Sequence, residues 1–265
     1  MTLYTEQSGT GPDMVLIHGW GAHGGIWSDL AATLEKNFRL TIVDLPGLGR
    51  SPALANGFTL ENAVTAIKAV TPDVAIWMGW SLGALITMAL AVNDKDRVKK
   101  MILVGGSPCF AKKKDWPFAT STEVLDGFGN MLETDYRKTL TRFLSLQMGD
   151  SSRGDSTRYR QVLRSQRQLL FKHGEPDITA LAEMLVVLKE TDLRESLSQV
   201  DVPALLIHGD RDTLAPVPAA NYLEQHLPRA RLFKIKGAGH VPFLTHTETC
   251  VQVINEFVNN DTYNE

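Results

Sequence analysis

Ala75-Ile76-Trp77-Met78-Gly79-Trp80-Ser81-Leu82-Gly83-Ala84 is the stretch of sequence that decides the fold. Its first four residues form a short apolar run that is typical of a buried strand, and a helical pattern follows from residue 82 to residue 92. The sequence G-x-S-x-G at such a junction indicates a nucleophile elbow, in which the serine lies on a sharp turn. The two glycines permit a strained backbone and close packing of helix on strand. We therefore expect Ser81 to be a nucleophile; the alternative is an ordinary glycine turn.

Short apolar runs alternate with segments of helical period on both sides of this stretch. Such alternation predicts an α/β fold with a mostly parallel central sheet flanked by helices. The expected strands are 14–17, 40–43, 75–78, 101–104, 204–207 and 231–235, with 3–6 as an antiparallel edge strand. The expected helices are 27–34, 59–70, 82–92 and 217–226.

Residues 111–198 interrupt this alternation. They lack β-branched strand runs and carry helical patterns at 121–131, 135–147 and 178–189. We expect a core domain made of residues 1–110 and 199–265, with residues 111–198 folded onto it as a helical lid.

Ester cleavage by a serine needs fixed N–H groups that stabilise a tetrahedral oxyanion. One should be the backbone N–H of Leu82, at the start of the helix. The other should come from the loop His18-Gly19-Trp20-Gly21 after the first parallel strand, where we expect the Trp20 N–H to serve. A plain glycine turn is the alternative for this loop. Trp20 and Trp80 would also flank the nucleophile and form an apolar wall for an acyl chain.

The catalytic base should be a histidine in a loop that follows the serine and the acid in the chain. His240 meets this condition, because it directly follows the last expected strand. His18 is the competitor, but it lies in the predicted oxyanion segment and is expected to be structural. The remaining histidines have weaker sequence contexts: His23, His173, His208, His226 and His246.

The catalytic acid should follow the strand at 204–207, where Gly209-Asp210-Arg211-Asp212 offers two carboxylates. We expect Asp212 to be the acid, because it lies farther into the loop. Asp210 would then stabilise the turn or pair with Arg211. A buried Asp212 would hold the imidazole in the tautomer that general-base catalysis requires.

Another aspartate, Asp44, opens the loop 44–51, where Pro46 and two glycines indicate a turn with a structural role. No histidine and carboxylate cluster has metal-ligand spacing, and no G-x-G-x-x-G opens a helix, so we expect neither metal nor cofactor.

The composition of the 265-residue chain, with 43% hydrophobic and 22% charged residues, is that of an ordinary globular protein. The first residues do not resemble a signal peptide, and no run approaches the ~20 apolar residues of a membrane span. With two isolated cysteines and no expected disulfide, the predicted location is the cytoplasm, with a monomer as the default state.

The motifs described so far resemble the α/β-hydrolase superfamily over nearly the whole chain. They are His18-Gly19-Trp20-Gly21, Asp44-Leu45-Pro46-Gly47, Gly79-Trp80-Ser81-Leu82-Gly83, Asp212 and His240. The G-x-x-D spacing of that superfamily agrees with Asp212 as the acid.

A narrower set of segments resembles the esterase family that hydrolyses the methyl ester of pimeloyl-acyl carrier protein in biotin synthesis. These segments are Ser107-Pro108-Cys109-Phe110, Asp115-Trp116-Pro117, Arg142-Phe143-Leu144, Leu146-Gln147 and Asp192-Leu193-Arg194. The resemblance implies that methanol and pimeloyl-acyl carrier protein are the products. It also implies that Trp20, Ser81, Leu82, His240 and the lid residue Phe143 are functional positions. The catalytic-acid loop carries more charge than we expect for that family.

Residues 136–172 hold nine basic and two acidic side chains, a net charge of +7, which leaves −10 for the rest of a chain whose net charge is −3. A basic patch on an acidic body can steer an acidic partner, and acyl carrier proteins are strongly acidic. The candidate docking residues are Lys138, Arg142, Arg158 and Arg164. The alternative is a solvated helix face. Nucleic acid is not expected, because the chain is acidic overall.

Two other functions remain open. One is a general short-chain carboxylesterase or a carbon–carbon bond hydrolase with the same triad. The other is a non-catalytic binding protein of this fold, although such proteins typically lose a triad residue and this chain has all three.

Overall fold

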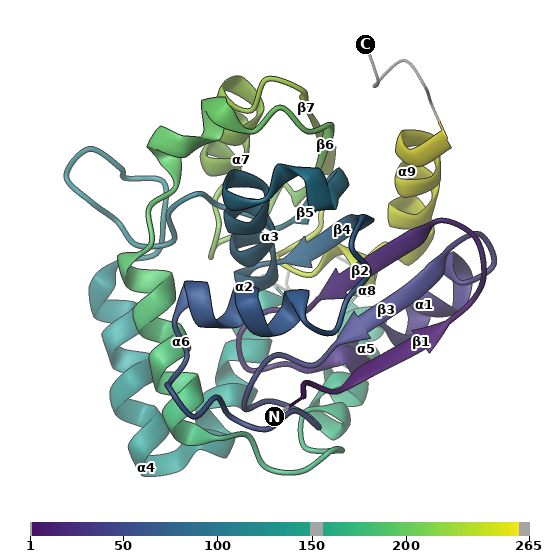
Figure 1. The fold of residues 1–265 in the computed structure, drawn as a ribbon. Coiled ribbons are helices and arrows are strands. Elements are labelled where there is room, and N and C mark those ends of the chain that lie inside the picture. Colours follow the sequence, from purple (N-terminus) through teal and green to yellow (C-terminus); the bar gives the residue numbers. More distant parts are fainter. Residues whose placement is uncertain (1, 149–155, 260–265) are drawn as a thin grey trace.

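The computed structural model describes residues 2–148 and 156–259, without the side chains of residues 156–158. A seven-stranded sheet lies at its centre (Figure 1), in the order β1-β3-β2-β4-β5-β6-β7. β1 pairs with β3 in antiparallel fashion, and the other neighbouring strands are parallel. The strands are β1 (Thr5–Ser8), β2 (Asp13–Ile17), β3 (Arg39–Val43), β4 (Ala75–Trp80), β5 (Val98–Val104), β6 (Ala204–Gly209) and β7 (Ala230–Ile235).

Helices cover both faces of the sheet because alternate strand residues are apolar on both sides. In β2, Val15 and Ile17 point into one core, whereas Met14 and Leu16 point into the other. The first core is closed by α2 (Leu60–Lys68), α3 (Leu82–Asn93) and α7 (Val217–His226), and the second by α1 (Ser28–Leu34) and α9 (Thr247–Asn259). Short helices complete the core: α8 (Pro242–Thr245), η1 (Gly24–Trp27), η2 (Lys95–Arg97) and η4 (Arg194–Gln199).

The six predicted parallel strands are confirmed, each within three residues at either end. The edge strand begins two residues later than predicted, at Thr5, which pairs with Val43. The Tyr4 carbonyl still accepts from the Asp44 N–H, but the Tyr4 N–H donates to the Ser51 hydroxyl at 2.9 Å. This side-chain hydrogen bond takes the place of a ladder bond, so the strand begins at Thr5.

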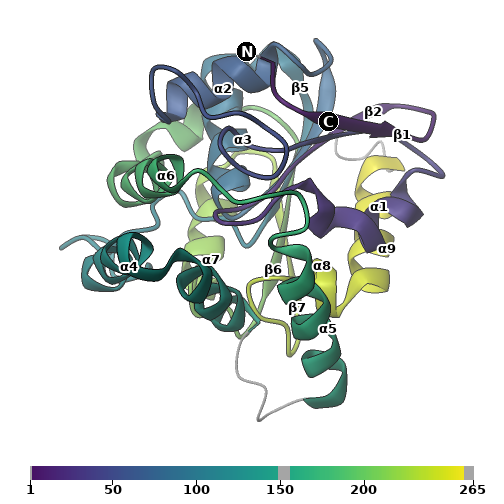
Figure 2. The same ribbon diagram turned by 90° about the horizontal axis from the view of Figure 1, so that it is seen from below.

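Among the described residues, three α-helices lie between β5 and β6: α4 (Thr122–Gln147), α5 (Ser156–Leu169) and α6 (Ile178–Glu190). Seen from below (Figure 2), α4 and α6 lie together on one side of the sheet, and α5 lies on the other side beside α8. The break predicted before residue 135 is present as a kink at Asp135, whose φ of −156° and ψ of 81° are not helical. The Asp135 carboxylate accepts a hydrogen bond from the Lys138 N–H (2.9 Å) and so caps the second half of α4.

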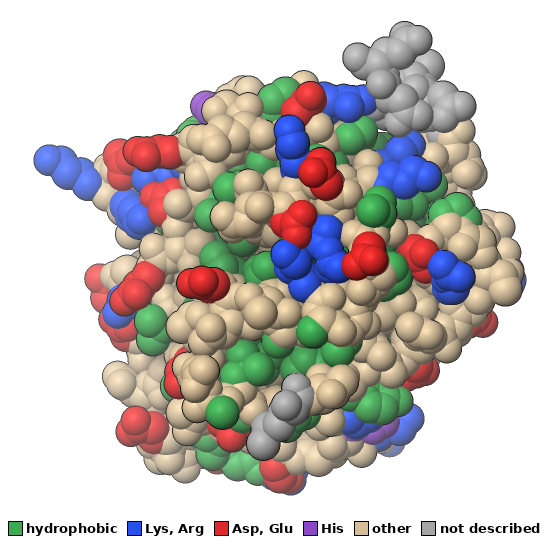
Figure 3. Space-filling view, in the orientation of Figure 1, with side chains coloured by type: hydrophobic (Ala, Val, Ile, Leu, Met, Phe, Trp, Pro, Cys, Tyr) green, Lys and Arg blue, Asp and Glu red, His purple; other side chains and the backbone are tan. Residues whose placement is uncertain are grey.

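The face of the molecule that carries α2 and α6 shows acidic and basic side chains interspersed (Figure 3). Some charged side chains form ion pairs: Arg97 pairs with Asp73, and Lys68 pairs with Asp94. Within the described ranges, no helix is long and apolar enough to cross a membrane.

Candidate active site

Ser81 has the backbone conformation of a nucleophile elbow. Its φ of 56° and ψ of −116° make it the one non-glycine residue with positive φ in the described part of the chain. A Cβ atom on Gly79 would lie 2.2 Å from the Gly83 carbonyl oxygen, and a Cβ on Gly83 would lie 2.2 Å from the Ile17 carbonyl oxygen. Both positions therefore require glycine for α3 to approach the sheet this closely.

His240 and Asp212 form a buried hydrogen-bonded pair. The Nδ1–H of His240 donates to Asp212 Oδ2 at 2.7 Å. The other carboxylate oxygen, Oδ1, accepts from the backbone N–H groups of Leu214 and Ala215, both at 2.9 Å. Burial alone would raise the pKa of Asp212, but the charge and hydrogen bond of His240 outweigh it, so the pKa lies below its ordinary value. The carboxyl is therefore ionised and orients the imidazole.

Asp210, the alternative acid, is exposed and far less constrained. Its Oδ1 accepts a hydrogen bond from the Gly237 N–H at 2.6 Å. This bond joins the loop after β6 to the turn after β7. The geometry is that of a turn-stabilising side chain, and it leaves Asp212 as the carboxylate beside His240.

Ser81 and His240 are brought together by the carboxyl end of β5. The Ser81 N–H donates to the Val104 carbonyl at 3.0 Å, and a Cβ on the next residue, Gly105, would lie 2.9 Å from Nδ1 of His240. The Nε2 atom of His240 is buried and makes no hydrogen bond to any described group. It is thus free to accept a proton from a neighbouring hydroxyl, in keeping with the loose nucleophile–base contacts of many unliganded sites.

Two backbone N–H groups close to Ser81 have no acceptor among the described residues: those of Trp20 and Leu82. Leu82 is the first residue of α3, where N–H groups lack intrahelical partners and favour negative charge. The Trp20 loop lies against Ser81, since a Cβ on Gly19 would lie 3.0 Å from Cβ of Ser81. The Trp20 indole donates to the Leu181 carbonyl of α6 at 2.9 Å, which fixes the loop. Both amides can therefore hydrogen-bond an oxyanion.

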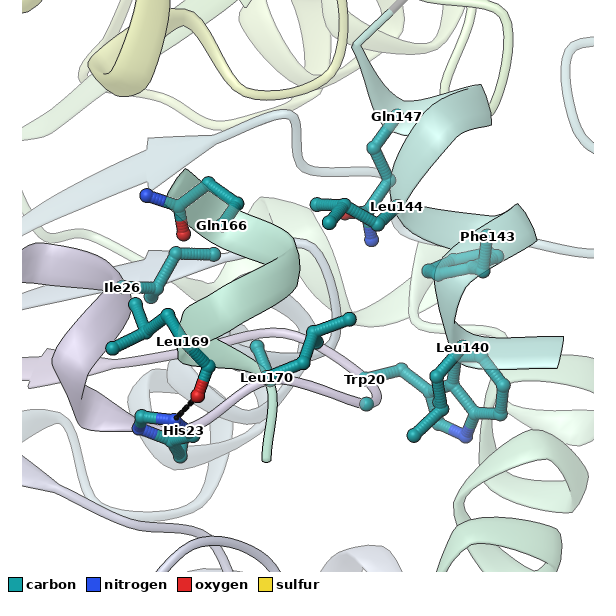
Figure 4. Close-up of a pocket in the computed structure, with 12 residues that line it drawn as sticks. Trp20, His23, Ile26, Leu140, Phe143, Leu144, Gln147, Gln166, Leu169 and Leu170 are labelled. Atoms are coloured by element: carbon teal, nitrogen blue, oxygen red, sulfur yellow. Dashed lines mark hydrogen bonds between the residues drawn. The ribbon is translucent and has the colours of Figure 1, made fainter. Parts of the chain in front are cut away.

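An apolar cavity adjoins the Trp20 loop (Figure 4). The Trp20 and Phe143 rings meet edge to face with centroids 4.7 Å apart, and Phe128 packs on Phe143 at 5.2 Å. The cavity volume is about 20 Å³, room for about one water molecule. In this conformation the cavity is too small for an acyl chain.

Trp80 lies beside Gly19 and His240 but outside that cavity. Its indole does not contribute to the lining of that cavity; it packs edge to face on Phe243 with centroids 5.4 Å apart. Its Nε1–H donates to the backbone carbonyl of His240 at 2.9 Å. Because side chains alternate along β4, Trp80 points into the core on the α1 and α9 side. Its ring also lies near the His240 imidazole, with centroids 5.8 Å apart, and its role as a wall for an acyl chain stays a prediction.

The structural roles expected for His18 and Asp44 agree with their contacts. His18 Nε2 accepts from the Leu45 N–H at 2.9 Å, so Nδ1 carries the proton and donates to the Gly19 carbonyl. Burial lowers the pKa of His18 to about 4. Asp44 is buried and accepts from the Gly24 N–H and from Arg50.

The expected docking residues lie on the inserted helices. Lys138 and Arg142 on α4 and Arg164 on α5 are exposed and form no ion pair with a described residue. The side chain of Arg158 lies outside the described residues. Among the described part of the chain, no group of three or more His, Cys, Asp or Glu side chains is placed to hold a metal ion.

The comparisons with known proteins agree with this geometry. A family model described as the alpha/beta hydrolase fold matches residues 12–247. The chain belongs to the α/β-hydrolase family.

Relatives of this α/β hydrolase share most of its length. It is 39% identical to the pimeloyl-[acyl-carrier protein] methyl ester esterase of Nitrosomonas europaea, over 94% of this chain and 97% of that protein. It is 38% identical to the protein of the same name from Xanthomonas campestris pv. campestris, over 97% of this chain and 98% of that protein. An esterase from Exiguobacterium antarcticum has a similar fold, with a TM-score of 0.86 at 22% identity, covering 97% of this chain and 96% of the other.

Sequence reasoning missed several polar residues at the site of this α/β hydrolase. Gln147 and Gln166 lie in the cavity wall, are 3% and 8% exposed, and make no side-chain hydrogen bond to a described group. His23 also lines the cavity and hydrogen-bonds the Leu169 carbonyl of α5 at 2.8 Å. His208 was missed as well; its Nε2 atom lies 3.5 Å from Asp212 Oδ2. The sequence signal was weak, because glutamine side chains are usually exposed.

Proposed function

We propose that this α/β hydrolase is a carboxylic ester hydrolase that cleaves the methyl ester of pimeloyl-[acyl-carrier protein] and releases methanol. The observation that carries the proposal is its identity of 34–39% to proteins of that name over at least 94% of the chain. The geometry around Ser81 supports the same class of reaction, because it combines an elbow serine, a carboxylate-bound histidine and two free buried amides.

In the proposed acylation step, Ser81 Oγ attacks the carbonyl carbon of the methyl ester while His240 Nε2 accepts the hydroxyl proton. The Trp20 and Leu82 N–H groups bind the oxyanion of the tetrahedral intermediate. When this intermediate collapses, the bond to methoxide breaks, and the imidazolium donates its proton to give methanol. Ser81 then carries the acyl group.

Deacylation repeats the sequence with water as the nucleophile. His240 takes a proton from water, the hydroxide attacks the acyl-serine, and the proton returns to Ser81 Oγ as the free carboxylate leaves. Asp212 remains ionised throughout and stabilises the imidazolium in both halves. Two backbone N–H groups hold Oδ1 of the carboxylate, which keeps Oδ2 directed at His240 and supports this role.

Residues 111–198 are proposed to act as the lid over this site. Phe143 of α4 contacts Trp20, and the Leu181 carbonyl of α6 binds the Trp20 indole, so the insertion forms the roof of the cavity. Because the cavity holds about 20 Å³, substrate entry requires the lid to shift.

The acyl carrier protein is proposed to dock on the exposed basic side chains of the lid. Lys138, Arg142 and Arg164 are available for an acidic partner, and Arg158 belongs to the same proposal by its position in α5. By contrast, Arg137 is already paired with Glu175. Exposed charges of one sign chiefly accelerate association and select the partner.

The decisive experiment is hydrolysis of purified pimeloyl-[acyl-carrier protein] methyl ester, followed by release of methanol. We expect turnover by the native chain and none by Ser81→Ala, and the native gene should restore growth of a biotin auxotroph that lacks this esterase. Cleavage of a p-nitrophenyl ester without cleavage of the carrier-bound ester would instead identify a general carboxylesterase.

A further inference from the structure

A second histidine, His208, contacts the carboxylate of the proposed triad. It is the fifth residue of β6, and its side chain is 1% exposed. Its Nε2 atom lies 2.6 Å from the carbonyl oxygen of Ala215 and 3.5 Å from Asp212 Oδ2. A carbonyl oxygen can only accept a hydrogen bond, so Nε2 of His208 carries the proton.

His208 and Asp212 hold one short turn from its two sides. The turn donates two N–H groups, those of Leu214 and Ala215, to Asp212 Oδ1. The carbonyl of the same Ala215 accepts the proton of His208. The three hydrogen bonds fix residues 212–215 as a unit, which leaves Oδ2 directed at Nδ1 of His240.

We propose that His208 is a positioning residue for the reaction: it fixes the turn that orients Asp212 and places a neutral N–H dipole beside the carboxylate. The inference rests on the proposed roles of Ser81, Asp212 and His240. His208 is then a fourth side chain of the proposed catalytic group; it acts through Asp212 and does not touch the substrate.

The proposal requires His208 to be uncharged. Burial lowers its pKa, and the nearby imidazole of His240 lowers it further, whereas Asp212 and the Ala215 carbonyl oppose this change. The register partner on the adjacent strand is Lys234, whose side chain is exposed. A protonated His208 would compete with His240 for Oδ2, so the neutral form is the one that leaves the catalytic pair intact.

The test compares two substitutions of His208 whose side-chain amides differ in length. Gln at position 208 is long enough to donate to the Ala215 carbonyl, whereas Asn is too short. We expect His208→Asn to lower kcat on a p-nitrophenyl ester by about 10-fold with KM changed less than about 2-fold, the loss of one oriented hydrogen bond. His208→Gln should recover most of that loss. His226→Asn, on the exposed side of α7, is the control and should leave kcat unchanged.

The pH profile separates positioning from simple structural damage. With the N–H dipole removed from Asp212, the carboxylate attracts the proton on His240 more strongly, so the acid limb of kcat/KM should move to higher pH in His208→Asn. A native acid limb in both variants, or equal losses in Asn and Gln, would overturn the proposal. Activity retained by Ser81→Ala would instead overturn the proposed function, so the two failures can be distinguished.

Discussion

Ser81 adopts a conformation that strains an L-amino acid and suits glycine. Its φ and ψ, 56° and −116°, are the mirror image of an ordinary extended conformation, so only a residue without Cβ enters it freely. Strain of this kind costs on the order of 1–3 kcal/mol and persists where the surroundings impose it. Here the close contact between β4 and α3 at their glycines imposes the conformation.

We therefore predict that two substitutions at position 81 differ in stability but not in activity. Ser81→Ala and Ser81→Gly should both abolish ester hydrolysis. Ser81→Gly should be more stable than Ser81→Ala by about 1 kcal/mol, because glycine removes the strain that alanine retains. Urea unfolding of the two variants measures the difference. Equal stabilities would show that the elbow carries no strain.

His18 gives the fold a dependence on pH. Its folded pKa is about 4, and its unfolded pKa is near the ordinary value of about 6.5. Between these two values the unfolded chain binds more protons, so the free energy of unfolding falls as the pH decreases from about 6.5 to about 4, by about 3 kcal/mol in total. The stability that the neutral form supplies is fully present above pH 6.5.

We predict that His18→Gln reduces this acid sensitivity. Glutamine can still accept the hydrogen bond from the Leu45 N–H but does not titrate. Urea unfolding at pH 7 and pH 4.5 should show a smaller difference for the variant than for the native chain. An identical pH dependence would assign the acid sensitivity to other groups.

The three residues proposed for catalysis could be predicted from the sequence, because a serine, a carboxylate and a histidine each occur at a fixed place relative to the strands. Ser81 follows a strand, and Asp212 and His240 follow the last two, so the shared edge of a parallel sheet predicts their proximity. The structure does place Asp212 against His240. The roles of all three residues remain predictions. His208 was not accessible, because its contact depends on a turn geometry that no sequence pattern encodes.

At the scale of elements, α5 and α9 were both missed. α9 carries a helical stripe of Cys250, Val253, Ile254 and Phe257, a signal that was available in the sequence. α5 is strongly polar on average, although its few apolar side chains lie along one face of the helix. Its burial comes from contact with α4, where the Tyr159 hydroxyl donates to the Ser145 carbonyl. Such tertiary contacts cannot be read from local periodicity.

α5 also places an amide against the cavity, and this position permits a test of stability. Gln166 is 8% exposed, borders the mostly apolar cavity and makes no side-chain hydrogen bond to a described group, so an apolar side chain of similar length would gain burial there without losing a hydrogen bond. Gln166→Met should therefore raise the free energy of unfolding by about 1 kcal/mol. Gln168→Met, on the exposed side of the same helix, is the matched control and should change it little. Destabilisation by Gln166→Met would show that the amide is already satisfied.

At the scale of the whole molecule, charge is distributed unevenly along the chain. The region 136–172 has a net charge of +7 and the rest −10. On the face that carries α2 and α6 the two signs are mixed (Figure 3), whereas α4 and α5 present Lys138, Arg142 and Arg164 without ion-pair partners among the described residues. An acidic protein would therefore approach on the α4 and α5 side.

We predict that Arg142→Glu lowers kcat/KM for the carrier-bound ester by about 10-fold and leaves a p-nitrophenyl ester unaffected, because the charge acts on association. Lys36→Glu makes the same charge change at an exposed position outside the basic region and should affect neither substrate. The defect of Arg142→Glu should shrink at high salt, where screening weakens the steering field. Equal losses on both esters would argue against docking at this site.

The hydrogen bond between the backbone N–H of His240 and the carbonyl of Gln147, at 2.8 Å, joins the proposed base to the last turn of α4. The same turn lines the cavity beside Trp20 through Leu144 and Gln147. A shift of about 1 Å at the end of α4 would carry this bond out of range. If the lid lifts to admit substrate, as proposed, the base would lose one of its backbone anchors while the lid is raised and regain it on closure.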